Sequence, residues 1–334
     1  MTAPATNPVT TAAQPWPDNT GDTAPKVGII YNQRSHRNRG QDLDIGSLPN
    51  VTVAQPATHD EIEIALQGFR AQGIDYLIIN GGDGTVRDVL TCAHGVFGEN
   101  WPDLAVLPKG KTNALNVDLG APTRWTLSEA IAAYGTGRRV KRHPLAVECA
   151  EGGRTLLGFI LGAGGFTLGV RAGQDAHRMG AFDSFAVGVT SAWGVLQGLL
   201  GSDDNIWRRG VEMTIRLGNE ARPLPRSQYG DPARRTVMMS STLEKFPVGI
   251  KLFGKLRAGL KLVVMDHPRR RLLAVFPAIL AGWSPPWLAK AGVHYAAAEH
   301  YELEIGDEFI LDGEAFPAGT YRVSKGPELS FVVP

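Results

Sequence analysis

The sequence predicts two domains, an N-terminal α/β domain followed by a domain of mostly antiparallel strands. Its 334 residues are enough for two domains of ordinary size. Up to about residue 143, short apolar runs alternate with segments of helical periodicity, which is typical of a parallel sheet covered by helices. From residue 145 onward, strand-like runs follow one another between turn-rich segments, and this indicates antiparallel pairing.

The first strand and the first helix are predicted within residues 26–73. Residues 26–32 (KVGIIYN) form a short apolar run rich in β-branched residues, as expected for a buried strand. Thr58, with Glu61 three positions later, is the pattern of a capping box that opens a helix. Gly73 is expected to end that helix, because glycine readily adopts the left-handed conformation found at helix C-termini.

Two further strands each lead into a glycine-containing loop. Residues 76–80 (YLIIN) run into the loop 81–85 (GGDGT), and the helical segment 86–93 (VRDVLTCA) follows. Residues 104–108 (LAVLP) run into the loop 109–113 (KGKTN), again followed by a helical stretch. Ligands of open α/β sheets bind at the carboxyl ends of the strands, so both loops are expected at the ligand site.

The second half contains six runs with strand character and one helical stretch near residues 182–200. The runs are 145–150 (LAVECA), 155–162 (TLLGFILG), 211–217 (VEMTIRL), 234–242 (RRTVMMSST), 260–265 (LKLVVM) and 301–305 (YELEI). Their density predicts a strand-rich domain over about residues 144–319.

The composition argues against several classes of protein. Lys and Arg number 34 against 33 Asp and Glu, a balance unlike that of a general nucleic-acid binder. Cys92 and Cys149 are the only cysteines, too few for a disulfide framework, and they indicate a reducing compartment. No run reaches the roughly 18 apolar residues of a membrane-spanning helix. Residues 1–25 lack the pattern of a signal peptide and are expected to form a mobile tail.

The loop Gly81-Gly82-Asp83-Gly84-Thr85 is the most informative segment of the chain. Its glycines allow backbone N–H groups to converge on an anion, and the following helix adds the positive end of its dipole. Asp83 would be unfavourable beside bare phosphate, but it suits a site that also holds Mg²⁺ or that needs a base for an attacking hydroxyl. The loop is not a Walker A motif, because no Gly-Lys-Ser/Thr follows. The alternative is a tight turn in which Asp83 only caps the helix.

The glycine loop and four other segments resemble, in the same order, the diacylglycerol kinase catalytic-domain family. This family includes bacterial soluble lipid kinases and the sphingosine and ceramide kinases, and it shares its glycine loop with NAD kinases and phosphofructokinases. The other segments are Asn32-Gln33-Arg34-Ser35, Pro108-Lys109-Gly110-Lys111-Thr112-Asn113 with Leu119-Gly120-Ala121-Pro122 after it, Gly162-Ala163-Gly164-Gly165-Phe166, and Leu311-Asp312-Gly313-Glu314. The resemblance runs from about residue 26 to the end of the chain.

The resemblance implies an ATP-binding α/β domain over residues 26–143 and a β-sandwich-like, lipid-binding domain over residues 144–319. It also implies that the last strand, near residues 320–334, returns to the first domain. The implied activity is that of a lipid kinase, an enzyme of lipid metabolism and phospholipid biosynthesis that uses ATP and Mg²⁺. Its acceptor would be a hydroxyl of diacylglycerol, of ceramide or a sphingoid base, or of a related lipid.

The residues carried over from the family divide into two groups. The nucleotide-binding group is Asn32, Arg34, Thr58, Gly81, Gly82, Gly84, Thr85, Gly110, Thr112 and Asn113. The catalytic group is Asp83, Asp312 and Glu314, of which Asp83 and Asp312 would also hold the metal. Phosphoryl transfer to an alcohol needs a carboxylate to accept the proton, and either Asp83 or Glu314 is suited to that role. From its spacing alone, Asp-Gly-Glu is also an ordinary hairpin turn carrying exposed acids.

Two alternative functions stay open because of departures from the family pattern and because of the shared loop. An NAD kinase has the same glycine–aspartate loop, although the Asp-Gly-Glu segment and Asn113-Ala114-Leu115 favour a lipid acceptor. A catalytically inactive regulator that binds nucleotide or lipid is the second alternative. It is suggested by Gln33 in the first turn and by Ala114, where many bacterial members carry Asp.

The expected partners are ATP, a lipid substrate and the surface of a membrane, with no nucleic acid and with a homodimer left open. Basic residues are mixed with apolar ones around Lys251, Lys255, Arg257 and Lys261, and basic residues also cluster at 138–143. Such mixtures can rest on anionic lipid, although an ordinary charged surface has the same composition. The expected location is the cytoplasm, with peripheral attachment to a membrane.

Overall fold

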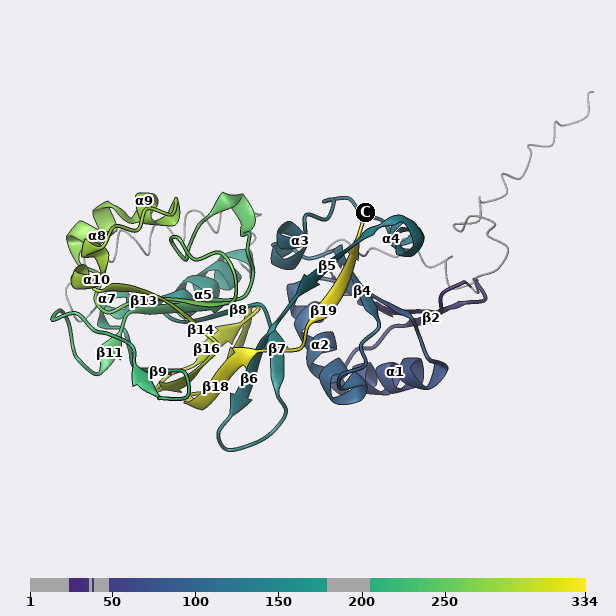
Figure 1. The fold of residues 1–334 in the computed structure, drawn as a ribbon, viewed down its shortest axis with the longest axis horizontal. Coiled ribbons are helices and arrows are strands. Elements are labelled where there is room, and N and C mark those ends of the chain that lie inside the picture. The colour runs from purple at the N-terminus through teal and green to yellow at the C-terminus, as the bar shows by residue number, and fades with distance from the viewer. Residues whose placement is uncertain (1–23, 36–37, 39–47, 179–204) are drawn as a thin grey trace, which may run out of the picture.

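The computed structural model describes residues 24–35, 38, 48–178 and 205–334. They form an N-terminal α/β domain and a C-terminal domain of mostly antiparallel strands, as the sequence predicts (Figure 1). The helix predicted near residues 182–200 lies outside the described residues.

The N-terminal domain is built on a six-stranded sheet. Its strands are β1 (Val27–Tyr31), β2 (Val51–Ala54), β3 (Tyr76–Gly81), β4 (Asp103–Pro108), β5 (Arg138–Arg142) and β19 (Leu329–Val333). Their order is β2-β1-β3-β4-β19-β5. All neighbours are parallel except β5, which runs antiparallel to β19. Strands β1, β3 and β4 are buried on both faces, as is usual for the central strands of a parallel sheet covered by helices.

Helices cover both faces of this sheet. They are α1 (His59–Gln72), α2 (Asp83–Phe97), α3 (Ala114–Leu119) and α4 (Leu127–Thr136). Leu77 and Ile79 of β3 pack in one core with apolar residues of α1, α2 and α3. Ile78, between them, belongs to a second core with α4. Successive side chains of a strand point to opposite faces, so one short apolar run supplies both cores.

The C-terminal domain consists of two sheets. The first has the order β10-β9-β15-β18-β6-β7, with β11 also pairing with β9, and the second has the order β14-β13-β12-β8-β16-β17. The bounds for the first are β6 (Leu145–Cys149), β7 (Leu156–Gly158), β9 (Val211–Leu217), β10 (Arg222–Pro223), β11 (Arg234–Arg235), β15 (His300–Ile305) and β18 (Gly319–Lys325). Those for the second are β8 (Ile160–Gly164), β12 (Val237–Ser241), β13 (Leu260–Met265), β14 (Val293–Ala298), β16 (Phe309–Leu311) and β17 (Glu314–Phe316). One apolar core contains residues of both sheets, which is the arrangement of a β-sandwich.

Short helices complete the C-terminal domain. They are α5 (Gly165–Arg178), α7 (Ile206–Arg209), α8 (Arg270–Ala274), α9 (Phe276–Leu280), α10 (Trp287–Ala291) and a 3₁₀ turn at Pro247–Gly249. No helix within the described ranges is long and apolar enough to cross a bilayer.

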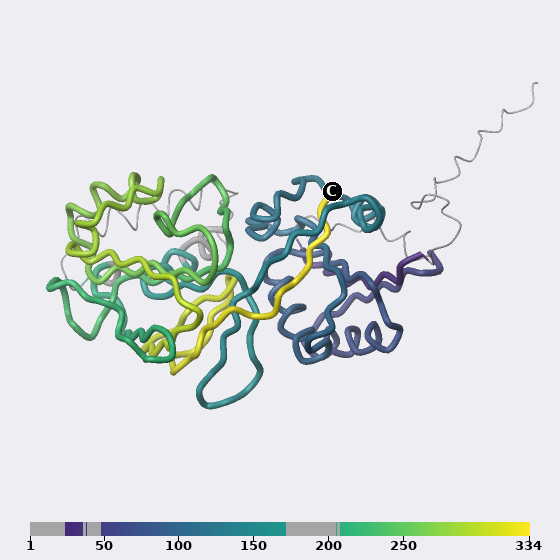
Figure 2. Tube along the Cα trace, in the orientation of Figure 1, coloured from purple at the N-terminus to yellow at the C-terminus, as the bar shows by residue number. Residues whose placement is uncertain are grey.

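Two adjacent stretches of chain connect the domains. β5 leads into β6 and β18 leads into β19, and the strands pair as β5 with β19 and β6 with β18. Figure 2 shows these two stretches side by side as the chain passes between the domains. The C-terminal strand is therefore part of the first sheet, next to β4.

Asp118 adds a side-chain link between the domains. Its fully buried carboxylate accepts hydrogen bonds from Nε of Arg142, at 2.6 Å, and from the backbone N–H groups of Glu244 and Lys245, at 2.7 Å each. The end of α3 is thereby fixed to the loop that follows β12.

Several local predictions need correction. Residues 155–162 are two strands in different sheets, because the carboxylate of Asp312 takes hydrogen bonds from the N–H groups of Phe159 and Ile160 where the chain changes sheets. The run 234–242 likewise divides at Thr236 into β11, which belongs to the first sheet, and β12, which belongs to the second. Several strands were not predicted, among them β2, β5 and β14. β5 is a basic segment without apolar alternation, and β2 and β14 are short or alanine-rich.

The predicted capping box of α1 is only half formed. The Thr58 hydroxyl accepts from the N–H of Glu61 at 3.3 Å, but the Glu61 carboxylate accepts from Ala57 instead of from Thr58. A complete capping box lies at Thr126 and Glu129, which open α4. The helix after the glycine loop begins at Asp83, three residues earlier than predicted, so the loop itself forms the first turn of α2.

Candidate active site

The two glycine loops meet through their backbones. A Cβ atom added to Gly82 would lie 2.8 Å from Cα of Gly110, and one added to Gly110 would lie 2.7 Å from Cα of Gly82. No real Cβ tolerates such a distance, so glycine is required on both sides of the contact. The loops that follow β3 and β4 therefore form one continuous backbone surface at the carboxyl ends of these strands.

The turn after β1 is tied to the first glycine loop. The amide Nδ2 of Asn32 donates to Oγ1 of Thr85 at 2.7 Å, and Oδ1 of Asn32 accepts from the N–H of Arg34 at 2.9 Å. The fully buried Asn80 precedes the loop, and among the described residues neither polar atom of its side-chain amide has a hydrogen-bond partner. Buried side-chain amides normally have hydrogen-bond partners, so Asn80, directly before the first glycine loop, is an exception.

Asn113 closes the second loop and starts α3. Its side chain accepts from the N–H of Gly110 at 2.8 Å and donates to the carbonyl oxygen of the same residue at 2.9 Å. Its φ of 51° lies in the left-handed region, which asparagine tolerates better than most residues. The loop is thus held in one shape by a side chain of its own.

Asp83 connects the two loops through hydrogen bonds of its carboxylate. It is the first residue of α2, and its carboxylate accepts hydrogen bonds from backbone N–H groups of Ala114, Asn113 and Leu115 at the start of α3. Burial raises the pKa of Asp83 above its ordinary value, while these N–H groups act in the opposite direction. Asp83 thus caps α3, rather than its own helix as the simple turn interpretation supposed.

Asp312 approaches from the C-terminal domain. Asp312 and Gly313 form the two-residue loop between β16 and β17, with φ values of 44° and 88°. Asp-Gly is the preferred pair for such a hairpin. The Asp312 carboxylate accepts from the N–H groups of Phe159, at 2.8 Å, and Ile160, at 2.9 Å. Burial, and next the negative charge of Asp83, raise the pKa of Asp312 to about 7. The charge of Asp83, in the other domain, is thus close enough to affect the Asp312 carboxyl group.

Arg87 is the residue of this region that the sequence analysis missed. Its guanidinium is buried, and Nη2 lies 2.6 Å from the carboxylates of both Glu314 and Asp88. Nη1 donates to the carbonyl oxygen of Leu311 at 3.2 Å. A basic residue two positions after a glycine–aspartate loop is a sequence signal for such a link, but its partner lies too far along the chain to be identified without the structure.

Three predicted residues are less closely engaged. Thr58 is exposed and uses its hydroxyl to cap α1, and the next residue, His59, contacts Asp88 at 3.2 Å. The side chains of Arg34 and Thr112 are exposed at the rim formed by the loops. Gly81 is constrained by Thr85, because a Cβ there would lie 2.5 Å from the Thr85 side chain, whereas Gly84 has open space around it.

The acids that converge here suit Mg²⁺ better than a metal held by protein alone. No group of three or more His, Cys, Asp or Glu side chains with metal-binding geometry occurs in the described part of the chain. Mg²⁺ is usually bound by one or two carboxylates together with substrate phosphates and waters. Asp83 and Asp312 are two such carboxylates beside a phosphate-type loop, so the residues present fit that ion.

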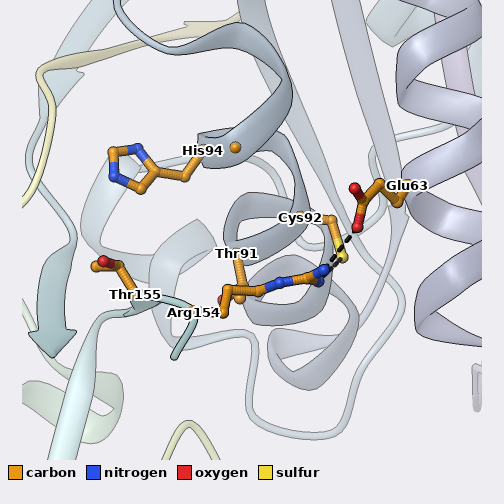
Figure 3. Close-up of a pocket in the computed structure, with 7 residues that line it drawn as sticks. Glu63, Thr91, Cys92, His94, Arg154 and Thr155 are labelled. Atoms are coloured by element: carbon orange, nitrogen blue, oxygen red, sulfur yellow. Dashed lines mark hydrogen bonds and ion pairs between the residues drawn. The ribbon is translucent and has the colours of Figure 1, made fainter. Parts of the chain in front are cut away.

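A cavity of about 230 Å³ lies away from these residues, between α1, α2 and the chain before β7 (Figure 3). The ion pair between Arg154 and Glu63, at 2.6 Å, crosses it, and Nη1 of Arg154 lies 3.3 Å from Sγ of Cys92. Burial raises the pKa of the Cys92 thiol, which disfavours a reactive thiolate. The cavity contains none of the predicted site residues.

Comparisons with known proteins agree with this arrangement. Residues 26–143 match the model of the diacylglycerol kinase catalytic domain, and this segment belongs to that domain family. No curated protein sequence matches the chain. The fold resembles the crystal structure of a diacylglycerol kinase from Bacillus anthracis strain Sterne, with 15% identity, a TM-score of 0.62, and coverage of 93% of this chain and 97% of that one. A second structure from the same organism, provisionally named a diacylglycerol kinase, has 14% identity, a TM-score of 0.61 and coverage of 94% and 98%. At these identities the two structures establish a common fold.

Proposed function

We propose that the protein is an ATP- and Mg²⁺-dependent lipid kinase that transfers the γ-phosphoryl group to a hydroxyl of diacylglycerol, ceramide, a sphingoid base or a related lipid. The domain of residues 26–143 would bind ATP, and the domain of residues 144–319 would bind the lipid. The enzyme would work in the cytoplasm and attach peripherally to a membrane.

One observation carries this proposal. Arg87, two residues after the first glycine loop, pairs with Glu314 and donates to the carbonyl oxygen of Leu311, so the Asp312-Gly313 hairpin loop of the C-terminal domain is held beside α2, which begins at Asp83. Two carboxylates beside a surface of backbone N–H groups are the components that phosphoryl transfer needs, because its catalysis consists mainly of positioning and charge neutralisation. Neither domain supplies the pair alone.

The proposal gives separate roles in phosphate binding and in metal binding to these residues. The backbone of both loops would hold the phosphates, and Asn32, through Thr85, would keep the first loop in place. Asp83 and Asp312 would hold Mg²⁺, which when bound neutralises charge on the transferring phosphoryl group. Backbone N–H groups on both carboxylates fix their orientation.

Glu314 is the carboxylate best placed to accept the proton of the lipid hydroxyl. Asp83 and Asp312 are already engaged by backbone N–H groups, whereas the Glu314 side chain is 57% exposed and is held at one oxygen by Arg87. A base must reach the proton that it accepts, and the more exposed carboxylate can do so in an open cleft. We therefore assign the base to Glu314.

The test is transfer of labelled phosphate from ATP by the purified chain, with and without Mg²⁺. The acceptors are diacylglycerol, ceramide and sphingosine in detergent micelles, and NAD in parallel. We expect Mg²⁺-dependent labelling of at least one lipid and none of NAD. Labelling of NAD alone would replace the proposal with an NAD kinase. No labelling by a folded chain that still binds ATP would replace it with an inactive regulator.

A further inference from the structure

The segment 245–298 has a charge unlike that of the rest of the chain. It contains nine basic residues and a single acidic one, Asp266, whereas the remaining residues contain 25 basic and 32 acidic side chains. Asp266 is buried and paired with Arg235 and His294. The surface of this segment therefore displays cations with no exposed carboxylate of its own.

Two parts of this segment pack into one continuous surface. The loop between β12 and β13 contacts the end of α9 and the chain after it, and the N–H of Lys251 donates to the carbonyl oxygen of Leu280 at 2.8 Å. A Cβ on Gly254 would lie 2.9 Å from the Ser284 side chain, and one on Gly282 would lie 3.0 Å from that of Lys251. Figure 1 shows this loop and helices α8 and α9 along the same upper side of the C-terminal domain.

Large apolar side chains protrude from the same surface. Val248, at the tip of the loop, is 96% exposed and has a φ of 60°, which is strained for a β-branched residue. Trp283 and Trp287 are 46% and 42% exposed, and their rings pack edge to face at 5.6 Å. Folding leaves these three residues in water, although each would gain from an apolar partner.

Exposed lysines surround these apolar residues. Lys251 and Lys255 lie on the loop, and Lys290 lies one turn after Trp287 on α10. We call the surface formed by Val248, Lys251, Lys255, Trp283, Trp287 and Lys290 the docking face. Lys261 is not part of it, because its side chain is buried and donates to the carbonyl oxygens of Arg257 and Gly259.

We propose that the docking face rests on a lipid bilayer that contains anionic lipids. Tryptophan is favoured at the level of the lipid headgroups, a protruding valine can enter the boundary with the acyl chains, and lysines are attracted to anionic headgroups. A second copy of the chain fits less well, because two such faces would bring like charges together.

The position of the docking face relates it to the candidate active site. The loop encloses a cavity of about 410 Å³ whose lining includes Val248, Lys251, Phe246 and Leu256, together with Val117 of α3. The start of α3 holds Asp83, so one short helix runs from Asp83 to this cavity. The inference deepens the proposed function, on which it rests, by naming the surface through which a lipid kinase would attach to the membrane that contains its substrate.

The test is sedimentation of the full chain with phosphatidylcholine vesicles, with and without phosphatidylglycerol, in the absence of nucleotide. We expect binding that requires phosphatidylglycerol and weakens with added salt. Lys251→Gln combined with Lys255→Gln should weaken binding about 30-fold, at about 1 kcal/mol for each lysine. Val248→Ser should weaken it about tenfold, through the apolar surface that no longer enters the bilayer.

Matched variants control for general effects of charge and apolar surface. Arg124→Gln combined with Arg222→Gln removes two exposed cations elsewhere, and Ile64→Ser removes an apolar side chain that is 67% exposed on α1. These variants should bind like the wild type. The proposal is overturned if they lose as much binding as the docking-face variants, if the wild type does not bind anionic vesicles, or if Val248→Ser instead dissociates a dimer.

Failure of the docking face and failure of the kinase activity give different results. Transfer of phosphate to a short-chain lipid dispersed without a bilayer does not need the docking face, so the docking-face variants should retain it. Vesicle binding without any such transfer contradicts the kinase activity alone. Transfer with no effect of the variants on vesicle binding contradicts the docking face alone.

Discussion

Nη2 of Arg87 lies 2.6 Å from Oε2 of Glu314, although the two residues are 227 positions apart in the sequence. Arg87 is buried within α2, and Glu314 begins β17 in the other domain. The same guanidinium also donates to the carbonyl oxygen of Leu311, so both ends of the Asp312-Gly313 hairpin loop are held by one side chain. The orientation of the C-terminal acids thus depends on a residue two positions after the glycine loop.

Replacing this guanidinium should impair turnover more than folding. Lysine keeps the charge, but it lacks the planar fork that reaches Asp88, Glu314 and Leu311 together. We expect Arg87→Lys to lower kcat at least about tenfold, with an unfolding free energy lowered by about 1 kcal/mol, since Glu314 is largely exposed and its ion pair is screened. Steady-state kinetics and urea denaturation measure the two effects.

A double-mutant cycle separates positioning of Glu314 from a general structural role of Arg87. In a Glu314→Gln background the base is already absent, so Arg87→Lys should change kcat little further. Equal effects of Arg87→Lys in both backgrounds would show that Arg87 acts independently of Glu314.

Asp83→Asn should abolish most turnover while the chain stays folded. The amide is neutral and cannot help to hold a divalent cation, and such charge stabilisation is worth several kcal/mol in the transition state. We expect phosphate transfer to fall about a hundredfold or more. Asp60→Asn, an exposed acid in the first turn of α1, is the matched control. Full activity of Asp83→Asn would remove Asp83 from the proposed mechanism.

Gly82→Ala should separate the two glycine loops. Its Cβ would be 2.8 Å from Cα of Gly110, and backbone cannot move aside as a flexible side chain can. Overpacking of this kind costs about 1–3 kcal/mol of unfolding free energy, and ATP binding should weaken with it. At Gly84 a Cβ meets nothing within 4 Å, so Gly84→Ala should keep or raise stability by up to about 1 kcal/mol. Equal destabilisation by both variants in urea would contradict the packed-loop contact.

Lys261 should make stability depend on alkaline pH. Burial lowers its pKa from 10.5 to about 8, so between these values the unfolded chain binds more protons than the folded one. Below pH 8 the buried charge therefore lowers the unfolding free energy by its full amount, and this destabilisation disappears as the pH rises towards 10.5. Lys261→Met should stabilise the protein by on the order of 2 kcal/mol at neutral pH, and this gain should vanish above that range.

The control for this pH effect is Lys255→Met, which changes an exposed lysine of the same loop. Unfolding free energies from denaturant titrations between neutral and alkaline pH provide the measurement. A constant difference between Lys261→Met and the wild type across that range would show that the buried lysine does not cause the pH dependence.

Local patterns were sufficient to predict the secondary structure around both glycine loops. Strands β1, β3 and β4 are short apolar runs, and glycine-containing loops follow β3 and β4. The Asp-Gly pair was read both as a hairpin turn and as a functional motif, and the structure shows the hairpin, with its Asp312 carboxylate bound to the N–H groups of Phe159 and Ile160. A turn preference depends on the residues of the turn, so it can be read from the sequence.

Strand β5 shows what local patterns do not contain. Its sequence, RRVKR, was interpreted as a basic surface, yet it pairs along its whole length with β19 from the other end of the chain. Its place in the sheet comes from backbone hydrogen bonds to that strand, and Arg142 is neutralised by Asp118. Neither contact leaves a periodic signal in the segment itself.

The sequence by itself determined the two-domain α/β and antiparallel fold and the two phosphate-type loops, because apolar periodicity and glycine placement act over a few neighbouring residues. Only the tertiary structure decided which distant groups lie close together. The contact of Gly82 with Gly110, the charge coupling of Asp83 with Asp312 and the ion pair of Arg87 with Glu314 all join separate segments. Such contacts depend on how strands and domains pack in space, and the spacing of residues along the chain does not specify that packing.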